Sequence, residues 1–155
     1  MAFTSLILYN DIVIMEIKTA KTQDEFFGLI QLRKDVFVNE QSVDVNLEMD
    51  TYDLSALHFI AVEKEEVIAT CRLILKEGYG KLGRMAVKKE HRSLHIGSKL
   101  LAYAEKQVLA NNIFIIKLEA QTHAIDFYLA NGYKITSSIF FDANIPHRMM
   151  EKQLK

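Results

Sequence analysis

The sequence predicts an α/β fold, a twisted mixed sheet with helices on both faces. An amphipathic helix pattern over residues 96–108 stands between two β-rich runs, at 81–87 and 113–120. Upstream, residues 57–62 and 67–75 are also β-rich and are separated by four charged residues, which favours a hairpin and an antiparallel first half of the sheet. With 155 residues, half of them apolar, the chain is long enough to bury one core.

The N-terminal residues leave two interpretations open. Met15 opens a short run that reads as the first strand of a core spanning residues 15–155. Residues 1–14 are then either an N-terminal extension or an additional strand or hairpin formed by 5–8 and 12–14. No internal repeat or Pro/Gly-rich linker follows, so we expect a single domain over residues 1–155.

A first helix is predicted over residues 22–38. Thr22 and Glu25 have the spacing of a capping box, and apolar residues then recur at helical intervals. Residues 39–55 are rich in acidic side chains and poor in apolar ones, which indicates an ordered loop or a short helix. Loops of this length often serve binding.

The C-terminal half continues the alternation of strands and helices. The helix that begins near residue 96 should end near Asn112, because asparagine tolerates a left-handed cap. After the strand at 113–120 we expect a short helix over 122–131, stopped by Gly132, and closing strands at 133–141 and 148–153.

Composition excludes several classes of protein. Nineteen basic and twenty acidic side chains give a formal charge of -1, so no overall field would gather nucleic acid or an anionic membrane. Cys71 is the only cysteine, which excludes an internal disulfide and favours a reducing, cytoplasmic setting. His91 and His95 are four residues apart with no third ligand evident, so we expect no metal site. The apolar stretches are shorter than the roughly 20 residues that span a bilayer, and no signal peptide is recognisable.

The segment that precedes and opens the second helix is the most informative. A helix start presents unpaired backbone N–H groups and can hold a phosphate. Arg92 and Gly97, with Ser98 following, resemble the signature of the GNAT acyltransferase superfamily: Arg or Gln, two variable residues, Gly, one variable residue, then Gly or Ala. The resemblance implies a loop that receives the pyrophosphate of coenzyme A, in a sheet splayed between its central parallel strands. The expected coenzyme-binding residues are Met85, Ala86, Val87, Arg92, Ser93, Leu94, His95, Ile96, Gly97, Ser98 and Gln121.

His95 departs from that signature, because it stands where the first glycine is expected. A histidine there adds a side chain and costs about 1 kcal/mol or more if φ is positive. It either crowds the phosphates or points outward and contacts one. The corresponding alternative to an enzyme is a GNAT-fold binding or regulatory protein whose coenzyme loop has degenerated.

A second stretch carries the same resemblance. Ala124, Phe127, Tyr128, Gly132 and Tyr133 match a pattern that is common in GNAT enzymes, and Gln121 takes the place of its asparagine. The resemblance implies that Tyr128 protonates the departing thiolate as general acid and that Gln121 hydrogen-bonds the pantetheine arm.

The implied reaction is direct transfer of an acetyl group from acetyl-coenzyme A to a primary amine of a small molecule or peptide, by a monomer or a homodimer. The reaction requires alignment, oxyanion stabilisation and removal of an amine proton. By the resemblance, the strand residues Met85, Ala86 and Val87 supply backbone N–H groups beside a bulge. The base is not identified by sequence, and six residues are candidates by position: Glu40, Glu48, Asp50, His58, Glu119 and His147.

Overall fold

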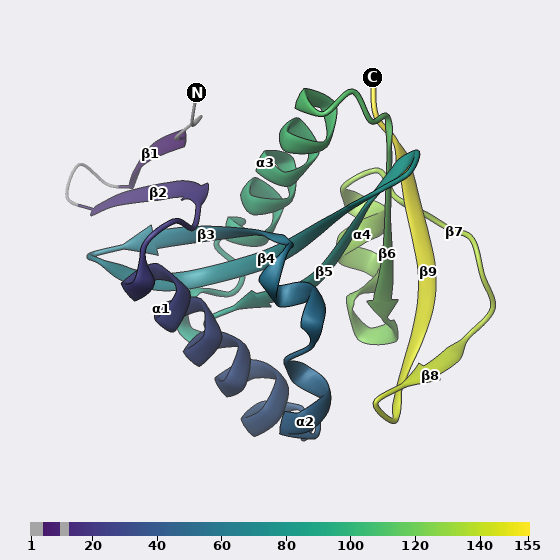
Figure 1. Ribbon diagram of the computed structural model, residues 1–155, viewed down its shortest axis with the longest axis horizontal. Helices are drawn as coiled ribbons and strands as arrows, with labels where there is room; N and C mark the ends of the chain where they lie inside the picture. Colours follow the sequence, from purple (N-terminus) through teal and green to yellow (C-terminus); the bar gives the residue numbers. More distant parts are fainter. Residues whose placement is uncertain (1–4, 10–12) are drawn as a thin grey trace.

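Strands β4 and β5 lie at the centre of a single mixed sheet (Figure 1). The computed structural model describes residues 5–9 and 13–155. The strands in this described part are β1 (Ser5–Tyr9), β2 (Val13–Thr19), β3 (Leu57–Glu63), β4 (Glu66–Lys76), β5 (Tyr79–Val87), β6 (Ile115–Gln121), β7 (Lys134–Ile135), β8 (Phe140–Asp142) and β9 (Ile145–Gln153). The sheet order is β1-β2-β3-β4-β5-β6-β9-β7, and β8 also pairs with β9. Only the β5–β6 pair is parallel among these described strands.

Helices cover both faces of the sheet (Figure 1). One face carries α1 (Gln23–Arg33), the π-helical η1 (Lys34–Glu40), α2 (Val45–Glu48) and the 3₁₀ turn η2 (Thr51–Leu54). The other carries α3 (Ile96–Ala110) and α4 (Ile125–Ala130), preceded by the 3₁₀ turns η3 (Lys89–His91) and η4 (Thr122–Ala124). The largest apolar cluster lies under α3, where Leu100, Leu101 and Val108 pack on Phe59 and Leu82. The predicted α/β fold is therefore confirmed.

A bulge and a divergence of strands shape the centre of the sheet. Between the pairs Thr70–Ala86 and Arg72–Gly83, β5 contains one residue more than β4, and Arg84 within that bulge has φ 52°. A bulge reverses which side chains face which side of the sheet. Leu82 therefore faces the α3 cluster, whereas Ala86 packs in the cluster with Val36 and Phe37 on the α1 face.

The parallel pairing of β5 with β6 is short. It covers only Gly80 to Leu82 on β5 and Ile116 to Leu118 on β6, after which the strands separate. Figure 1 shows the two strands diverging toward their C-terminal ends. The splayed sheet implied by the resemblance is thus present, and the two C-terminal halves form the walls of a gap.

The N-terminal expectations are largely confirmed. Residues 5–9 pair with 13–17, so the reading of this segment as an additional hairpin holds, while residue 12 lies outside the described part. The capping box of Thr22 and Glu25 forms as predicted. The single helix predicted to residue 38 is wrong, because α1 ends at Arg33 and a π-helix continues to Glu40. The wider π turn buries the neighbours Val36 and Phe37 together.

The strand predicted over residues 133–141 is also wrong as a single element. Only β7 and β8 form, because Ser137 lies outside the ladder: its hydroxyl accepts from Met149 N and its carbonyl from Arg148 Nε. A two-residue turn at Ala143 and Asn144, both with positive φ, then returns the chain into β9, which begins earlier than the predicted 148–153. The helix predicted over 122–131 is the turn η4 followed by α4.

Candidate functional site

The loop ahead of α3 has the backbone shape of an anion-binding turn. Ser93 has φ 68° and His95 has φ 60°, so both adopt the left-handed region. His95 is the N-cap residue of α3, and its side chain makes no capping hydrogen bond. The backbone N–H groups of Ile96, Gly97 and Ser98 in the first helical turn therefore have neither an intrahelical partner nor a side-chain cap. His95 adopts the left-handed conformation at the position where the family signature has glycine.

Gly97 lies where α3 packs closely on α4. A Cβ at this position would lie 3.2 Å from Cζ of Phe127 on α4. Nearby, Asn131 at the end of α4 donates to the Ser98 hydroxyl at 3.2 Å and to the Phe127 carbonyl at 2.8 Å. These contacts fix the start of α3 against α4, which carries Tyr128.

The guanidinium of Arg92 is held by hydrogen bonds to Glu40 and to the main chain. Its Nη2 lies 2.8 and 3.0 Å from the two carboxylate oxygens of Glu40, and its Nε donates to the Val87 carbonyl at 3.0 Å. The guanidinium thus ties the loop to the end of η1 and to the end of β5. Ser93 and Leu94 are exposed beside it.

Strand β5 directs unpaired backbone groups into the gap. Lys88 N donates to Ile68 O on β4, so by alternation the amide of Ala86 also faces β4. The amides of Met85 and Val87 then face the side from which β6 has diverged. The bulge before Met85 makes this arrangement. The resemblance implied that the amide of Ala86 would also face the gap, and this is wrong, because that amide points to β4.

Between the diverging strands lies a cleft of about 960 Å³. Its lining includes the predicted residues from Met85 to Val87, Arg92, Ser93, the first residues of α3, Gln121 and Tyr128. Leu94 does not belong to that lining. The structure therefore brings nearly all the predicted site residues to one cavity, at the upper end of the size typical for ligand pockets.

Tyr128 reaches the cleft from the α4 side. Its side chain is only 7 % exposed and is held edge-on between Phe127 and Tyr133, with ring centroids 4.9 and 5.8 Å away. Tyr128 is one of the residues that line the cleft, and no group in the described part of the chain hydrogen-bonds to its hydroxyl. Burial raises the pKa of this phenol above its usual range, so the hydroxyl keeps its proton at neutral pH.

Gln121 spans the opening between the walls. Its Nε2 donates to Oε1 of Gln41 at 2.7 Å, so the end of β6 is linked to the residue that caps η1. Sequence reasoning did not find Gln41, because a contact between residues 80 positions apart leaves no local pattern. Glu40 and Gln41 together connect η1 to both the Arg92 loop and β6.

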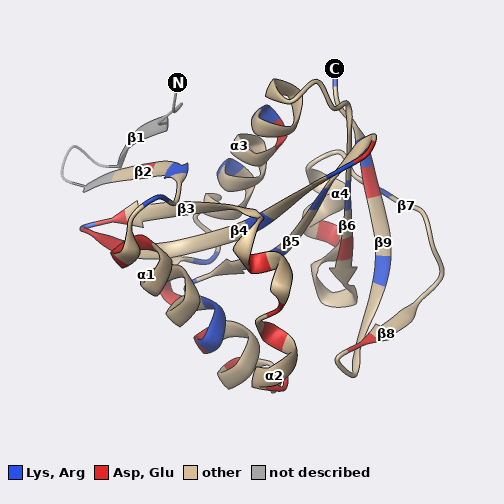
Figure 2. Cartoon of the chain, in the orientation of Figure 1, with Lys and Arg blue, Asp and Glu red and all other residues tan. Residues whose placement is uncertain are grey.

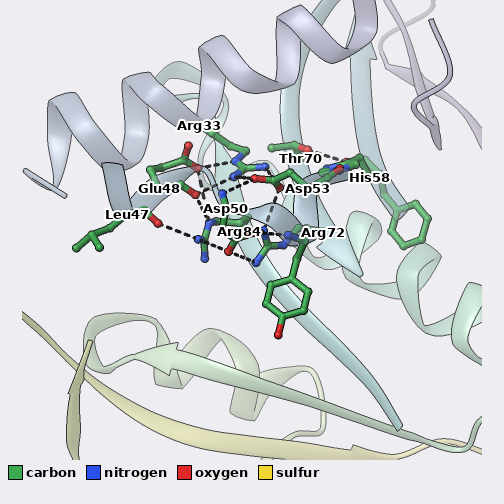
Figure 3. A network of polar contacts seen from close by, with 11 residues as sticks. Arg33, Leu47, Glu48, Asp50, Asp53, His58, Thr70, Arg72 and Arg84 are labelled. Atoms are coloured by element: carbon green, nitrogen blue, oxygen red, sulfur yellow. Dashed lines mark hydrogen bonds and ion pairs between the residues drawn. The ribbon is translucent and has the colours of Figure 1, made fainter. Parts of the chain in front are cut away.

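A network of buried charges fixes the segment between η1 and β3 (Figure 3). Arg33, 1 % exposed, donates from Nε to Glu48 Oε1 at 2.5 Å and from Nη1 and Nη2 to Asp53 at 2.8 and 3.2 Å. Arg72 on β4 donates to Asp50 at 2.7 and 3.2 Å and to Asp53 at 3.0 Å.

The bulge residue Arg84 completes this network. It donates to the Glu48 carbonyl at 3.0 Å and to Asp50 at 3.3 Å (Figure 3). Three arginines therefore balance three carboxylates, and the loop carrying Glu48 and Asp50 is held against the bulge. Burial opposes the charge of Asp53, but hydrogen bonds from Arg33, from Asp50 N and from Arg72 outweigh it and hold its pKa well below the usual range.

The six candidate bases occupy different environments. Glu40, Glu48 and Asp50 are bound by arginines, as described above. His58 is buried outside the cleft lining, with Nε2 2.9 Å from the Asp53 carbonyl. The other two, on β6 and β9, both line the cleft: Glu119 lies 3.6 Å from Lys81 Nζ, and His147 has Nδ1 2.6 Å from the Ile145 carbonyl.

The described residues were also compared with what a membrane-spanning helix, a metal site or a strongly charged surface would require. Within residues 5–9 and 13–155 no helix is long and apolar enough to cross a membrane. No three His, Cys, Asp or Glu side chains of that part gather as a metal site would require. Acidic and basic side chains are interspersed on the same elements, for instance on α1 and β9 (Figure 2). Cys71 is buried in the core, and burial raises the pKa of its thiol.

Known proteins are similar to this chain in architecture and in sequence. Residues 17–154 match the family model described as an acetyltransferase (GNAT) domain. The uncharacterized N-acetyltransferase YjcF of Bacillus subtilis is 34 % identical over 139 residues, covering 89 % of this chain and 99 % of that protein. An acyl-CoA N-acyltransferase from Pseudomonas aeruginosa has a TM-score of 0.80 at 26 % identity, covering 96 % of this chain and 99 % of its own.

An aminoglycoside 6'-N-acetyltransferase complexed with coenzyme A has the same fold, with a TM-score of 0.74 at 18 % identity over 88 % of this chain and 96 % of that one. The match of the family model over almost the whole chain, together with the splayed sheet and the α3 loop, shows the family. This chain belongs to the GNAT acetyltransferase family and is an acetyltransferase.

Proposed function

We propose that the protein transfers an acetyl group from acetyl-coenzyme A to a primary amine, by direct attack while both substrates are bound. The observation that carries this proposal is the cleft between β5 and β6. Three uncapped amides at the start of α3 border the cleft, two strand amides face into it, and a buried phenol lies along its wall. The α3 amides would bind the pyrophosphate, the strand amides would bind the pantetheine arm, and the phenol would give its proton to the departing thiolate.

The pyrophosphate would bind to backbone amides from Ile96 to Ser98. The positive end of the α3 dipole favours an anion there, and the left-handed turn at His95 aims these amides outward. Arg92 supports the loop by its pairing with Glu40 instead of meeting the phosphate directly. The coenzyme-binding residues predicted above thus act mainly through the main chain, which agrees with their varied side chains.

The pantetheine arm would lie along the exposed edge of β5. The free amides of Met85 and Val87 face this edge, and one of them can donate to the thioester oxygen as it becomes negative. Gln121, on the opposite wall, holds one amide proton in its bond to Gln41 and keeps its Oε1 for the arm.

The leaving group takes its proton from Tyr128. As the amine nitrogen attacks, the C–S bond breaks and sulfur leaves as a thiolate that needs one proton. A phenol with an ordinary pKa of about 10 is already protonated at neutral pH, and burial raises the pKa of Tyr128 further, so the hydroxyl carries the proton that the thiolate needs. The acceptor enters from the other face of the sheet, past α2 and the β8–β9 turn, whose residues border the cleft.

Calorimetry and a thiol-release assay test this function together. The protein should bind acetyl-coenzyme A with a dissociation constant on the order of micromolar, about -8 kcal/mol. It should also release coenzyme A thiol when members of a panel of alkylamines, such as tyramine, spermidine and Nα-acetyl-lysine, are added. No heat at millimolar acetyl-coenzyme A would contradict the proposal. Release that is the same with and without any amine would contradict the amine acceptor.

A further inference from the structure

The side chains of β6 and β9 form the wall of the cleft that faces the acceptor. These strands pair antiparallel, with Gln121 opposite His147 and Glu119 opposite Met149. Alternation places Leu118, Ala120 and Met150 in the core on the α3 side. Glu119, Gln121 and His147 therefore point to the other face, opposite the one from which Tyr128 enters.

A base for the amine must have an oxygen or nitrogen with a free lone pair on this wall. Glu48 and Asp50 line the cleft from α2 and the loop after it instead of from this wall, and arginines pair with their carboxylates. Glu40 pairs with Arg92 and is not among the residues that line the cleft, and His58 is buried outside it. Only two of the six candidates, Glu119 and His147, remain.

His147 is oriented as a general base requires. Its Nδ1 lies 2.6 Å from the Ile145 carbonyl oxygen, which can only accept, so Nδ1 carries a hydrogen. In the neutral ring the lone pair is then on Nε2, for which the described part of the chain provides no hydrogen-bonding partner. The ring is 8 % exposed and stacks on Phe140, with centroids 5.9 Å apart and planes at 21°. Carbonyl and aromatic ring together fix the direction of Nε2.

Glu119 is less well held. It is partly exposed, and its Oε1 faces Lys81 Nζ at 3.6 Å, a distance typical of a loose surface pair. By register it is the diagonal neighbour of His147 on the same face. Its charge can favour a cation on this wall, whereas no hydrogen bond aims its lone pairs.

We propose that His147 is the general base of the transfer, an inference that rests on the proposed function. The acceptor attacks as a neutral amine; its nitrogen forms the C–N bond and loses one proton to Nε2 of His147. The electron pair returning to the carbonyl expels sulfur, which takes the Tyr128 proton. Solvent then carries one proton from the imidazolium to the phenolate. Amine and acetyl-coenzyme A thereby yield amide and coenzyme A thiol, with both side chains restored.

The first test compares His147→Gln with Glu119→Gln. An alkylamine that the wild type acetylates serves as acceptor in single-turnover and steady-state assays. His147→Gln should lower kcat about 10²- to 10⁴-fold while the dissociation constant of acetyl-coenzyme A changes less than about threefold. A larger loss of kcat in Glu119→Gln than in His147→Gln would overturn the assignment.

Two further variants keep the test decisive. His147→Asn places an amide N–H where Nδ1 lies, so it can retain the bond to Ile145 while it lacks the basic nitrogen; it should lose as much kcat as His147→Gln. His147→Ala should recover at least about tenfold in kcat on addition of imidazole, because the free base fills the vacated space beside Phe140. Glu151→Gln, on the same strand, is the matched control and should leave turnover unchanged.

The outcomes distinguish a failure of the His147 assignment from a failure of the proposed acetyl transfer. If the wild type releases thiol with an amine and His147→Gln and His147→Asn keep kcat within about threefold, the histidine is not the base and the transferase stands. If the wild type neither binds acetyl-coenzyme A nor releases thiol, the proposed function fails and this inference falls with it.

Discussion

Several residues beside the cleft adopt a positive φ, which residues with a side chain do not favour. His95 and Ser93 adopt positive φ ahead of α3, and Arg84 does so inside β5. Each such residue costs about 1 kcal/mol or more relative to glycine, and strain of this kind gathers at functional sites. At His95 the cost gives a helix start with three free amides, and at Arg84 it gives a bulge that is tied to α2.

Tyr128 allows the sharpest prediction at the scale of one residue. Tyr128→Phe removes only the hydroxyl, which has no hydrogen bond to lose in the described part of the chain, so stability should change little. Turnover should fall roughly 10- to 1000-fold, with the affinity for acetyl-coenzyme A nearly unchanged, because one general acid is lost. Steady-state thiol release and calorimetry measure the two effects.

Tyr133 provides the matched control. It is also a buried tyrosine, lies edge-on to Tyr128, and donates its hydroxyl to Glu105 at 3.1 Å, but it does not line the cleft. Tyr133→Phe should therefore cost about 1 kcal/mol of stability and leave kcat intact. If both variants lowered kcat alike, the effect would be one of packing and Tyr128 would not be the acid.

At the scale of elements, local patterns predicted what local interactions determine. The capping box at Thr22, the left-handed end of α3 at Asn112 and the helix with its flanking strands all agree with the structure. The π-helix η1 did not follow from its sequence, because tertiary burial of Val36 and Phe37 overrides an ordinary helical pattern. The bulge at Arg84 was expected only from the resemblance, because the local sequence does not determine a register that depends on the neighbouring strand.

The candidate site shows the same division. The candidate coenzyme loop could be predicted because its residues are consecutive, and the resemblance placed the candidate acid Tyr128 on the next helix. The Arg33 network and the link from Gln41 to Gln121 could not, because their partners are 15 to 80 positions apart. For the same reason sequence left six bases open, and the proposal of His147 rests on the cleft lining, on the arginine pairs of other candidates and on the direction of its lone pair.

Arg33 should anchor the segment between η1 and β3 more strongly than any surface pair in its vicinity. Arg33→Met leaves the buried Glu48 without its close ion-pair partner and leaves Asp53 with Arg72 as its only arginine, so we expect a loss of about 3–5 kcal/mol in the free energy of unfolding. Lys18→Met, which breaks the partly exposed pair with Glu25, should cost only about 0–1 kcal/mol. Urea unfolding of both variants measures the difference; equal losses would show that burial adds nothing to the Arg33 pairs.

Over the whole molecule, the buried network of Arg33, Arg72 and Arg84 links the elements proposed to border the acceptor to those proposed to bind coenzyme A. It holds α2 and η2, which border the proposed entrance for the acceptor, against β4 and against β5, the strand that would bind the pantetheine arm. Glu40 and Gln41 extend that link to the coenzyme loop and to β6. The free energy that keeps the cleft assembled therefore depends on charges whose state changes with pH.

Stability should fall in two stages as the solution is acidified. His58 donates from Nε2 to the Asp53 carbonyl, and its Nδ1 is buried without a partner. Burial lowers the pKa of His58, and the nearby charges of Arg33 and Arg72 lower it further. Below about pH 6.5 the unfolded chain therefore binds a proton at His58 more readily than the folded chain does. The free energy of unfolding then falls with decreasing pH, by at most about 1.4 kcal/mol per pH unit.

The second stage belongs to Asp53. Its pKa is depressed in the folded protein, so its contribution is complete above about pH 4, the value for an unfolded carboxyl, and is lost below it. His58→Gln retains a donor for the Asp53 carbonyl but cannot be protonated, so it should flatten the slope between about pH 6.5 and 5 and leave the decline below about pH 4. Urea midpoints at a series of pH values resolve the two stages. A slope that persists unchanged near pH 6 in His58→Gln would assign the first stage to another group.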